Sequence, residues 1–114
     1  MMKKSHKCIL AIVNRGFAEV AMEAAKACGA RGGTILQGRG TISKEAEKIF
    51  NISIQPEKEI VMILAKSELI DGILKGLYNA IGTATQAQGI AFALPVDEVV
   101  GLNDKPIEKK SKTE

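Results

Sequence analysis

Short runs of consecutive apolar residues alternate along this chain with two longer segments of helical periodicity. The runs CILAIV (8–13), IVMILA (60–65) and GIAFAL (89–94) are apolar at nearly every position. This pattern is typical of strands that are buried on both faces. A fourth strand is predicted over residues 33–40, GTILQGRG, which runs out into an arginine flanked by glycines.

The two periodic segments predict amphipathic helices between these strands. In the first, apolar residues recur at helical spacing from Phe17 to Cys28, and Gly29 is well placed to end the helix. In the second, Ser67 is expected to cap a helix whose apolar stripe runs through residues 69–81. The long excursion over residues 41–58 contains a further cap candidate, Ser43, before a turn or two of helix.

The order strand, helix, strand, strand, helix, strand predicts an α+β fold. It is the ferredoxin-like βαββαβ plan, in which a four-stranded antiparallel sheet carries both helices on one face. Because the strands are apolar at nearly every position, the second face of the sheet must also be covered, and no element is left to do so. We therefore expect subunits to pack sheet against sheet in a closed cyclic oligomer.

Composition fits one globular domain over residues 1–103, followed by a charged tail over residues 104–114 that is expected to be disordered. No apolar run approaches the roughly 20 residues of a membrane span, and the basic start MMKKSHK lacks a signal-peptide core, so a cytoplasmic location is predicted. With one Tyr, three Phe and no Trp, the chain offers little for bases to stack on. Nucleic-acid binding is not expected.

Catalytic and metal-binding patterns are weak. The single histidine, His6, lies in the basic lead without a recognisable triad, so we expect no enzyme activity. His6 and Cys8 together could ligate a soft metal, but strand alternation is expected to send the Cys8 thiol into the core. Cys8 and Cys28 are predicted to be buried thiols in a reducing compartment.

Two segments could instead bind a small ligand. In GRG, residues 38–40, glycines let backbone N–H groups approach an anion, and Arg39 offers a planar charged fork for phosphate or carboxylate. The loop GTATQAQG, residues 82–89, offers hydroxyls, amides and backbone donors but no charge, which suits a neutral or adenine-like edge. Each segment can equally be a plain turn or connection.

The segments ILAIVNRGFAEVAMEAAKACGARGGTILQGRG, EIVMILAKSELIDGIL and GIAFALPVDEVV resemble the PII signal-transduction family of nitrogen regulatory proteins, over about residues 7–102. The most specific part is AFALPVDEVV, which is similar to the family's C-terminal signature strand. The resemblance implies a homotrimer that binds an adenine nucleotide (ADP, AMP or ATP) between subunits as an effector, with no required cofactor. Many members also sense 2-oxoglutarate. The family regulates a partner, such as a membrane transporter or a metabolic enzyme, through a long loop after the second strand.

The resemblance also implies positions for the ligand. Thr34, Gly38 and Gly40 fall where the family's second strand and loop base hold the nucleotide, and Gly89 matches the glycine that closes its phosphate-contacting loop. The expected ligand-binding residues are Thr34, Gly38, Arg39, Gly40, Gln86, Gln88 and Gly89.

The sequence departs from the family at positions where the family has basic residues. Ile90 replaces the phosphate lysine, and Gly101 and Asn103 replace the basic pair that follows the Leu-Pro-Val strand. Because charge-assisted hydrogen bonds are the strong ones, we expect Arg39 to compensate only in part. A ligand with fewer phosphates would need less compensation.

The segment over residues 41–58 is shorter than the family's docking loop and lacks the tyrosine that some members modify. We expect it either to dock on a partner, through Lys44, Glu45, Lys48 and Phe50, or to form a solvated cap. Ligand contacts at the loop base would then bias its order. Two rivals remain, namely a trimeric metal-binding protein resembling the CutA relatives, using His6, Cys8 and Cys28, and a trimeric scaffold without a ligand.

Overall fold

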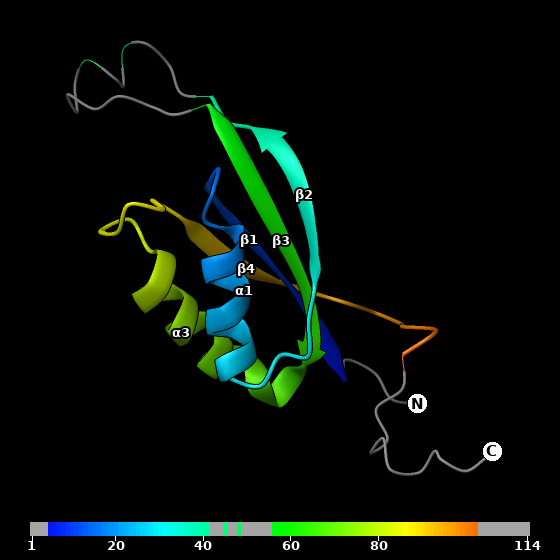
Figure 1. The fold of residues 1–114 in the computed structure, drawn as a ribbon. Coiled ribbons are helices and arrows are strands. Elements are labelled where there is room, and N and C mark those ends of the chain that lie inside the picture. The colour runs from blue at the N-terminus through cyan, green and yellow to red at the C-terminus, as the bar shows by residue number, and fades with distance from the viewer. Residues whose placement is uncertain (1–4, 42–44, 46–47, 49–55, 103–114) are drawn as a thin grey trace.

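A computed structural model of the chain describes residues 5–41, 45, 48 and 56–102. Its centre is one four-stranded antiparallel sheet in the order β2-β3-β1-β4 (Figure 1). The strands are β1 (His6–Asn14), β2 (Thr34–Arg39), β3 (Glu57–Lys66) and β4 (Ile90–Pro95). Helices α1 (Ala18–Ala27) and α3 (Ile70–Ile81) both lie on one face of this sheet. The predicted α+β, ferredoxin-like plan is therefore confirmed.

The hydrophobic core lies between the sheet and the two helices. Alternate residues of the central strands, such as Ile9 and Ile63, are fully buried there, and α3 contributes Ile73 and Leu77. The buried positions of α1 are mostly alanines, which let that helix approach the sheet closely. Among the described residues, the buried apolar ones are Ile9, Ala11, Val13, Ala18, Ala21, Met22, Ala25, Ala30, Val61, Ile63, Ala65, Ile70, Ile73, Leu77, Ile81 and Ala87.

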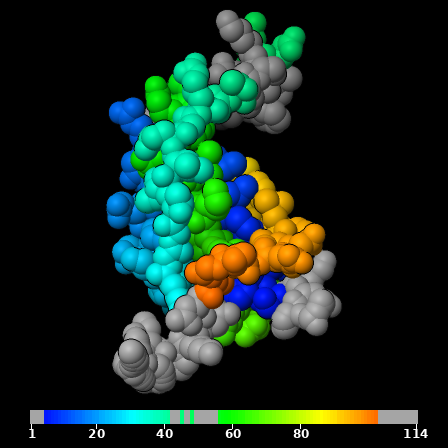
Figure 2. Space-filling view, turned by 90° about the vertical axis from the view of Figure 1, so that its right-hand side faces the viewer, coloured from blue at the N-terminus to red at the C-terminus, as the bar shows by residue number. Residues whose placement is uncertain are grey.

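The opposite face of the sheet is apolar and carries no helix among the described residues (Figure 1). Directly opposed residues of antiparallel strands share a face, and the register places Leu10 opposite both Met62 and Phe92. On this face 38% of Met62, 39% of Phe92 and 40% of Leu94 remain exposed. Figure 2 views the molecule from the side of this face, and the orange residues at the end of the described chain cross its lower part. The bare apolar face predicted from the sequence is therefore present.

Several local predictions need correction. Ser67 does not cap α3, because it begins the 3₁₀ turn η1 (Ser67–Leu69) and its N–H donates to the carbonyl of Ser5, 2.9 Å away. Strand β3 starts at Glu57, so the final two residues of the predicted excursion belong to the sheet. Ser43 and the tail over residues 104–114 lie outside the described residues.

The cysteines also differ from expectation. Cys8 opposes Leu64 and Leu94 on the uncovered face rather than pointing into the core, because the buried apolar residues of β1 are the odd-numbered Ile9, Ala11 and Val13. Cys28 stands at the C-terminal cap of α1. Both are free thiols of intermediate exposure. In the part of the chain that the structure describes, neither helix has the length and hydropathy to cross a bilayer.

Candidate ligand site at one end of the sheet

The end of β2 lies against the beginning of β3. Gly38 opposes Lys58 and Arg39 opposes Glu57, and beyond the strand the N–H of Gly40 donates to the carbonyl of Pro56 at 2.7 Å. A Cβ built on Gly40 would come within 2.9 Å of Cε of Lys58. The absence of a side chain at position 40 therefore lets the lysine stem lie against the backbone.

The end of β2 and the beginning of β3 form a corner of the sheet, and Asn14 joins this corner to the loop over residues 82–89. It is the last residue of β1 and is only 6% exposed. Its Oδ1 accepts a 2.7 Å hydrogen bond from Nζ of Lys58, and its Nδ2 donates to the carbonyl of Gln86 at 3.2 Å. Its backbone N–H donates to the carbonyl of Ala87 at 3.0 Å. One buried amide thus brings together the two segments that sequence analysis singled out separately.

The loop itself is folded back onto α3 by a series of turns. The N–H of Thr85 donates to Gly82, that of Gln88 to Thr85, and that of Gly89 to the carbonyl of Ile81. Gln88 adopts a left-handed conformation with φ of 46°. These three backbone donors therefore already have partners inside the protein, and a ligand would meet the remaining donors and the exposed amides of Gln86 and Gln88.

Gly89 has a packing role. A Cβ at this position would lie 2.7 Å from the carbonyl oxygen of Ile81 and 2.9 Å from Cγ1 of Val13. The backbone of residue 89 therefore has to pass directly over the core, and only glycine permits this approach. That packing contact explains the glycine without any ligand.

Thr34 lies at the other end of β2. It opposes Met62, which lies four residues along β3 from Lys58, the residue opposite Gly38. At about 3.3 Å per residue, this places Thr34 roughly 13 Å from Gly38 along the strand. Within one chain the structure brings residues 38–40 toward residues 86–89 but does not bring Thr34 to them.

Charges of both signs gather at this end of the sheet. Arg39 is directly opposite Glu57 in the strand register, whereas Lys58, between Glu57 and Glu59 on β3, points to the other face of the sheet. Oε1 of Glu59 accepts the N–H groups of Gly16 and Ala18, each at 3.0 Å, and so serves as an acceptor for the first turn of α1. With Glu59 engaged by the helix and Glu57 opposite Arg39, the lysine held by Asn14 is the cation that an anionic ligand on its face of the sheet would meet.

Sequence analysis missed Asn14 and Lys58. The apolar run begins only at Ile60, so Lys58 falls within the predicted excursion. Continuing the two-residue strand period backwards from Ile60 places Lys58 on the same face and would have extended the strand. No sequence signal links Asn14 to Lys58, which is 44 positions away, or to Gln86, which is 72 positions away. Only the folded sheet brings these residues together.

Other predicted positions fall as follows. Glu45 and Lys48 are exposed, whereas Lys44 and Phe50 lie outside the described residues. Ile90, in the place of the family's lysine, is 53% exposed on β4. Gly101 has a positive φ of 94°, and Asn103 lies outside the described range. No group of three or more His, Cys, Asp or Glu residues able to hold a metal occurs within the described residues.

The sheet order and the two helices on one face define a ferredoxin-like domain. Comparison with solved structures gives the same fold. The chain is similar to Arabidopsis thaliana PII bound to citrate, with a TM-score of 0.65, 20% identity, and coverage of 87% of this chain and 82% of that one. It is also similar to CPII, a nitrogen regulatory PII-like protein from Thiomonas intermedia K12 bound to ADP, AMP and bicarbonate. For CPII the TM-score is 0.62 and the identity 18%, with coverage of 85% of this chain and 96% of that one.

The same fold occurs inside a larger protein. A Bacillus cereus protein related to NIF3 matches with a TM-score of 0.66 and 15% identity, over 86% of this chain but only 27% of that one. No family model matches the sequence, and no curated protein is significantly similar to it. The chain therefore has the fold of PII nitrogen regulatory proteins at low sequence identity.

Proposed function

We propose that this protein is a PII-type signalling protein. In this proposal it is a homotrimer that binds an adenine nucleotide in clefts between subunits and regulates a partner protein, without catalysing a reaction. The observation that carries the proposal is the hydrogen-bonded corner in which Asn14 joins Lys58 to Gln86. This corner supplies a positioned cation beside the two segments that the family resemblance assigns to the nucleotide.

The uncovered sheet face supports the trimer. Its exposed apolar residues come from β2, β3 and β4, and such a continuous patch is typical of an interaction surface. Two further copies, each presenting the same face, would cover it by cyclic symmetry.

Lys58 supports an anionic effector. Its ammonium group retains donors beyond the one that bonds to Asn14, and those can meet a phosphate or a carboxylate. Because Ile90 and Gly101 carry no charge, the site has fewer cations than the family pattern, and ADP or AMP suits it better than ATP. The ADP and AMP bound to CPII support the same ligand class.

Nucleotide binding can be tested by calorimetric titration of ADP, AMP and ATP into the full chain. We expect binding that weakens by about tenfold in Lys58→Gln, in keeping with the loss of one charge-assisted hydrogen bond. Arg39→Gln should weaken binding as well. Lys75→Gln, which removes an equal charge from the exposed side of α3, is the matched control and should bind as the unmodified protein does. If no nucleotide binds at millimolar concentration, the protein is a scaffold or takes a different effector.

The trimer is tested independently by sedimentation equilibrium. Phe92→Glu places a charge on the uncovered face, on β4 beside Leu10, and should dissociate the assembly. Tyr78→Glu is the control, because Tyr78 is 73% exposed on α3, on the other side of the sheet. A monomer in the unmodified protein, or a Phe92→Glu variant that remains a trimer, would contradict the proposed assembly.

A further inference from the structure

The chain continues past β4 as an irregular segment over residues 96–102, which we call the C-terminal arm. Strand β4 ends at Pro95, and no helix or strand follows it within the described residues. In Figure 1 the arm, drawn in orange, leaves the sheet on the side away from the two helices. Figure 2, which faces the uncovered side, shows it in front of the lower part of the sheet. The arm therefore stands on the same side of the molecule as the bare apolar face.

The outermost part of the arm is apolar and exposed. Val100 is 90% exposed, and 36% of Val99 is exposed as well. Gly101 follows with a φ of 94°, a left-handed conformation in which the chain turns. Beyond this turn Leu102 lines a pocket together with Leu64 of β3, so the arm returns to the sheet. Its two ends are thus held by the sheet, and between them the valines are presented to solvent.

Two acidic residues precede these valines. Asp97 and Glu98 are both exposed, and residues 96–102 contain no basic residue. The arm therefore presents an apolar pair next to two negative charges. This segment is the second half of AFALPVDEVV, and the candidate ligand site uses none of it.

The bare face of the sheet has the complementary character. Because side chains alternate along a strand, the even-numbered residues of β3 lie on this face with Met62. They include Lys58 and Lys66, one toward each end of the strand, whereas Glu57 and Glu59 point to the other face. On the four described strands no acidic residue shares the bare face. The face is thus apolar in its centre and basic at its ends.

We propose that the arm of one copy docks on the bare sheet face of a neighbouring copy. Val99 and Val100 would contact the neighbour's exposed apolar residues, and Asp97 and Glu98 would lie toward a lysine at one end of its face. Burial of the valines removes apolar surface of both copies from water, and the opposite charges favour one orientation. This inference rests on the proposed trimer and names the segment that joins its subunits.

The occupant is a second copy because of where the arm stands. It projects from the face that subunits cover in the proposed trimer, so a copy that approaches this face meets the arm (Figure 2). The contact joins two different surfaces, an arm and a sheet face, and is therefore heterologous. Heterologous contacts close into rings when the rotation between copies permits it, which agrees with a trimer rather than a two-fold dimer.

Sedimentation equilibrium of the full chain tests the valines. Val100→Asp should weaken association about tenfold for each arm, and therefore about a thousandfold for a trimer with three arms. Since 90% of Val100 is exposed, the variant should keep its fold, and far-UV circular dichroism would verify this. Val20→Asp is the matched control, because Val20 is 44% exposed on α1, on the other side of the sheet. It should associate as the unmodified protein does.

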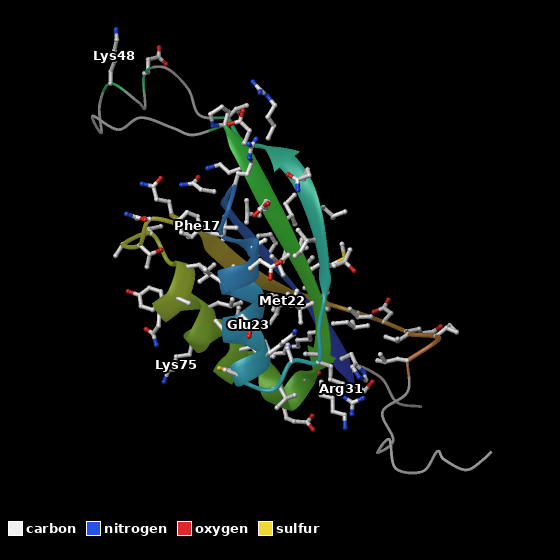
Figure 3. All side chains as sticks on the ribbon, viewed as in Figure 1. Phe17, Met22, Glu23, Arg31, Lys48 and Lys75 are labelled. Atoms are coloured by element: carbon white, nitrogen blue, oxygen red, sulfur yellow. The ribbon has the colours of Figure 1, made fainter. Side chains whose placement is uncertain are left out.

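The charges are tested by a double variant. Asp97→Asn with Glu98→Gln should weaken association, and the remaining association should depend less on NaCl concentration, because salt screens the charge contacts that the variant removes. Glu19→Gln with Glu23→Gln is the control, since it changes the net charge equally on exposed positions of α1. Figure 3 shows Glu23 on that helix, on the side of the sheet away from the arm. The control should keep the salt dependence of the unmodified protein.

Isotope-filtered NOE spectra locate the arm in a trimer refolded from labelled and unlabelled chains. The Val100 methyl groups of one copy should contact Met62 or Phe92 of another. A trimer that Phe92→Glu dissociates but Val100→Asp leaves intact, or Val100 contacts confined to its own chain, would overturn the docking of the arm and leave the proposed trimer standing. A monomeric unmodified protein would contradict the trimer itself, and the docking of the arm with it.

Discussion

The ammonium group of Lys58 donates a 2.7 Å hydrogen bond to Oδ1 of Asn14, across the boundary between β3 and the end of β1. The same asparagine also holds two carbonyls of the loop that leads into β4. Its amide therefore fixes the relative position of a cation and a loop that are distant in sequence. This relationship makes the end of the sheet one structural unit.

Replacing this asparagine should destabilise the protein. Asn14→Ala removes two side-chain hydrogen bonds at a buried position and leaves the Gln86 carbonyl without that donor. We expect a loss of about 2 to 4 kcal/mol in the free energy of unfolding, measured by urea denaturation at fixed protein concentration. Asn79→Ala, at an exposed position of α3, is the control and should change it little. Equal effects of the two variants would contradict the role given to Asn14.

Glu59 should stabilise the start of α1. The cap residue Phe17 makes no side-chain cap hydrogen bond, and Oε1 of Glu59 accepts two N–H groups there. Glu59→Ala should cost about 1 to 2 kcal/mol, comparable to the loss of an N-cap. Glu59→Gln keeps an acceptor oxygen and should cost less. Urea denaturation of both variants tests this order, and a larger loss in Glu59→Gln would refute it.

Two glycines should respond in opposite directions to alanine. Gly89→Ala would place a Cβ against the Ile81 carbonyl and Val13, so we expect destabilisation of about 1 to 3 kcal/mol from overpacking. Gly72, in the first turn of α3, has open space at its Cβ position. Gly72→Ala should therefore stabilise by about 0.5 to 1 kcal/mol through helix propensity. Thermal unfolding distinguishes the two signs.

The contact between α1 and α3 depends on a third glycine. A Cβ on Gly76 would lie 2.6 Å from Sγ of Cys28, so the thiol has to move in Gly76→Ala. In a Cys28→Ala background this clash is absent, and the same substitution should stabilise by about 1 kcal/mol, the helix-propensity gain. A double-mutant cycle measures this coupling. Additive effects of the two substitutions on the free energy of unfolding would contradict this coupling between Gly76 and Cys28.

The Cys8 thiol should react slowly with alkylating reagents near neutral pH. Burial raises the pKa of Cys8 because it disfavours the thiolate, and the thiolate is the nucleophile. Raising the pH increases the thiolate fraction, so the rate in a Cys28→Ser variant should still be climbing at a pH where the urea-unfolded chain has levelled off. Mass spectrometry of iodoacetamide labelling measures both rates. A native rate equal to that of the unfolded chain at every pH would be inconsistent with this assignment.

The sequence by itself determined the elements and their plan. Short, β-branched runs such as IVMILA are typical of buried strands, and the periodic stripe of α3 is typical of a helix with one buried face, so the βαββαβ order was predicted from local pattern. The bare apolar face was also evident, because the strands do not alternate apolar and polar residues. Element ends were less certain, as Lys58 and Ser67 show, since strand pairing rather than composition fixes them.

Only the tertiary structure decided which polar residues meet. Asn14 contacts Lys58 and Gln86 because the register of β1, β3 and the loop brings three distant segments to one corner. His6 and Lys66 are neighbours for the same reason, at the opposite end of the same strand pair. Periodicity reports how each segment faces the core, but it carries no information on register between strands. The physical reason is that register is set by the packing of whole faces, which no single segment contains.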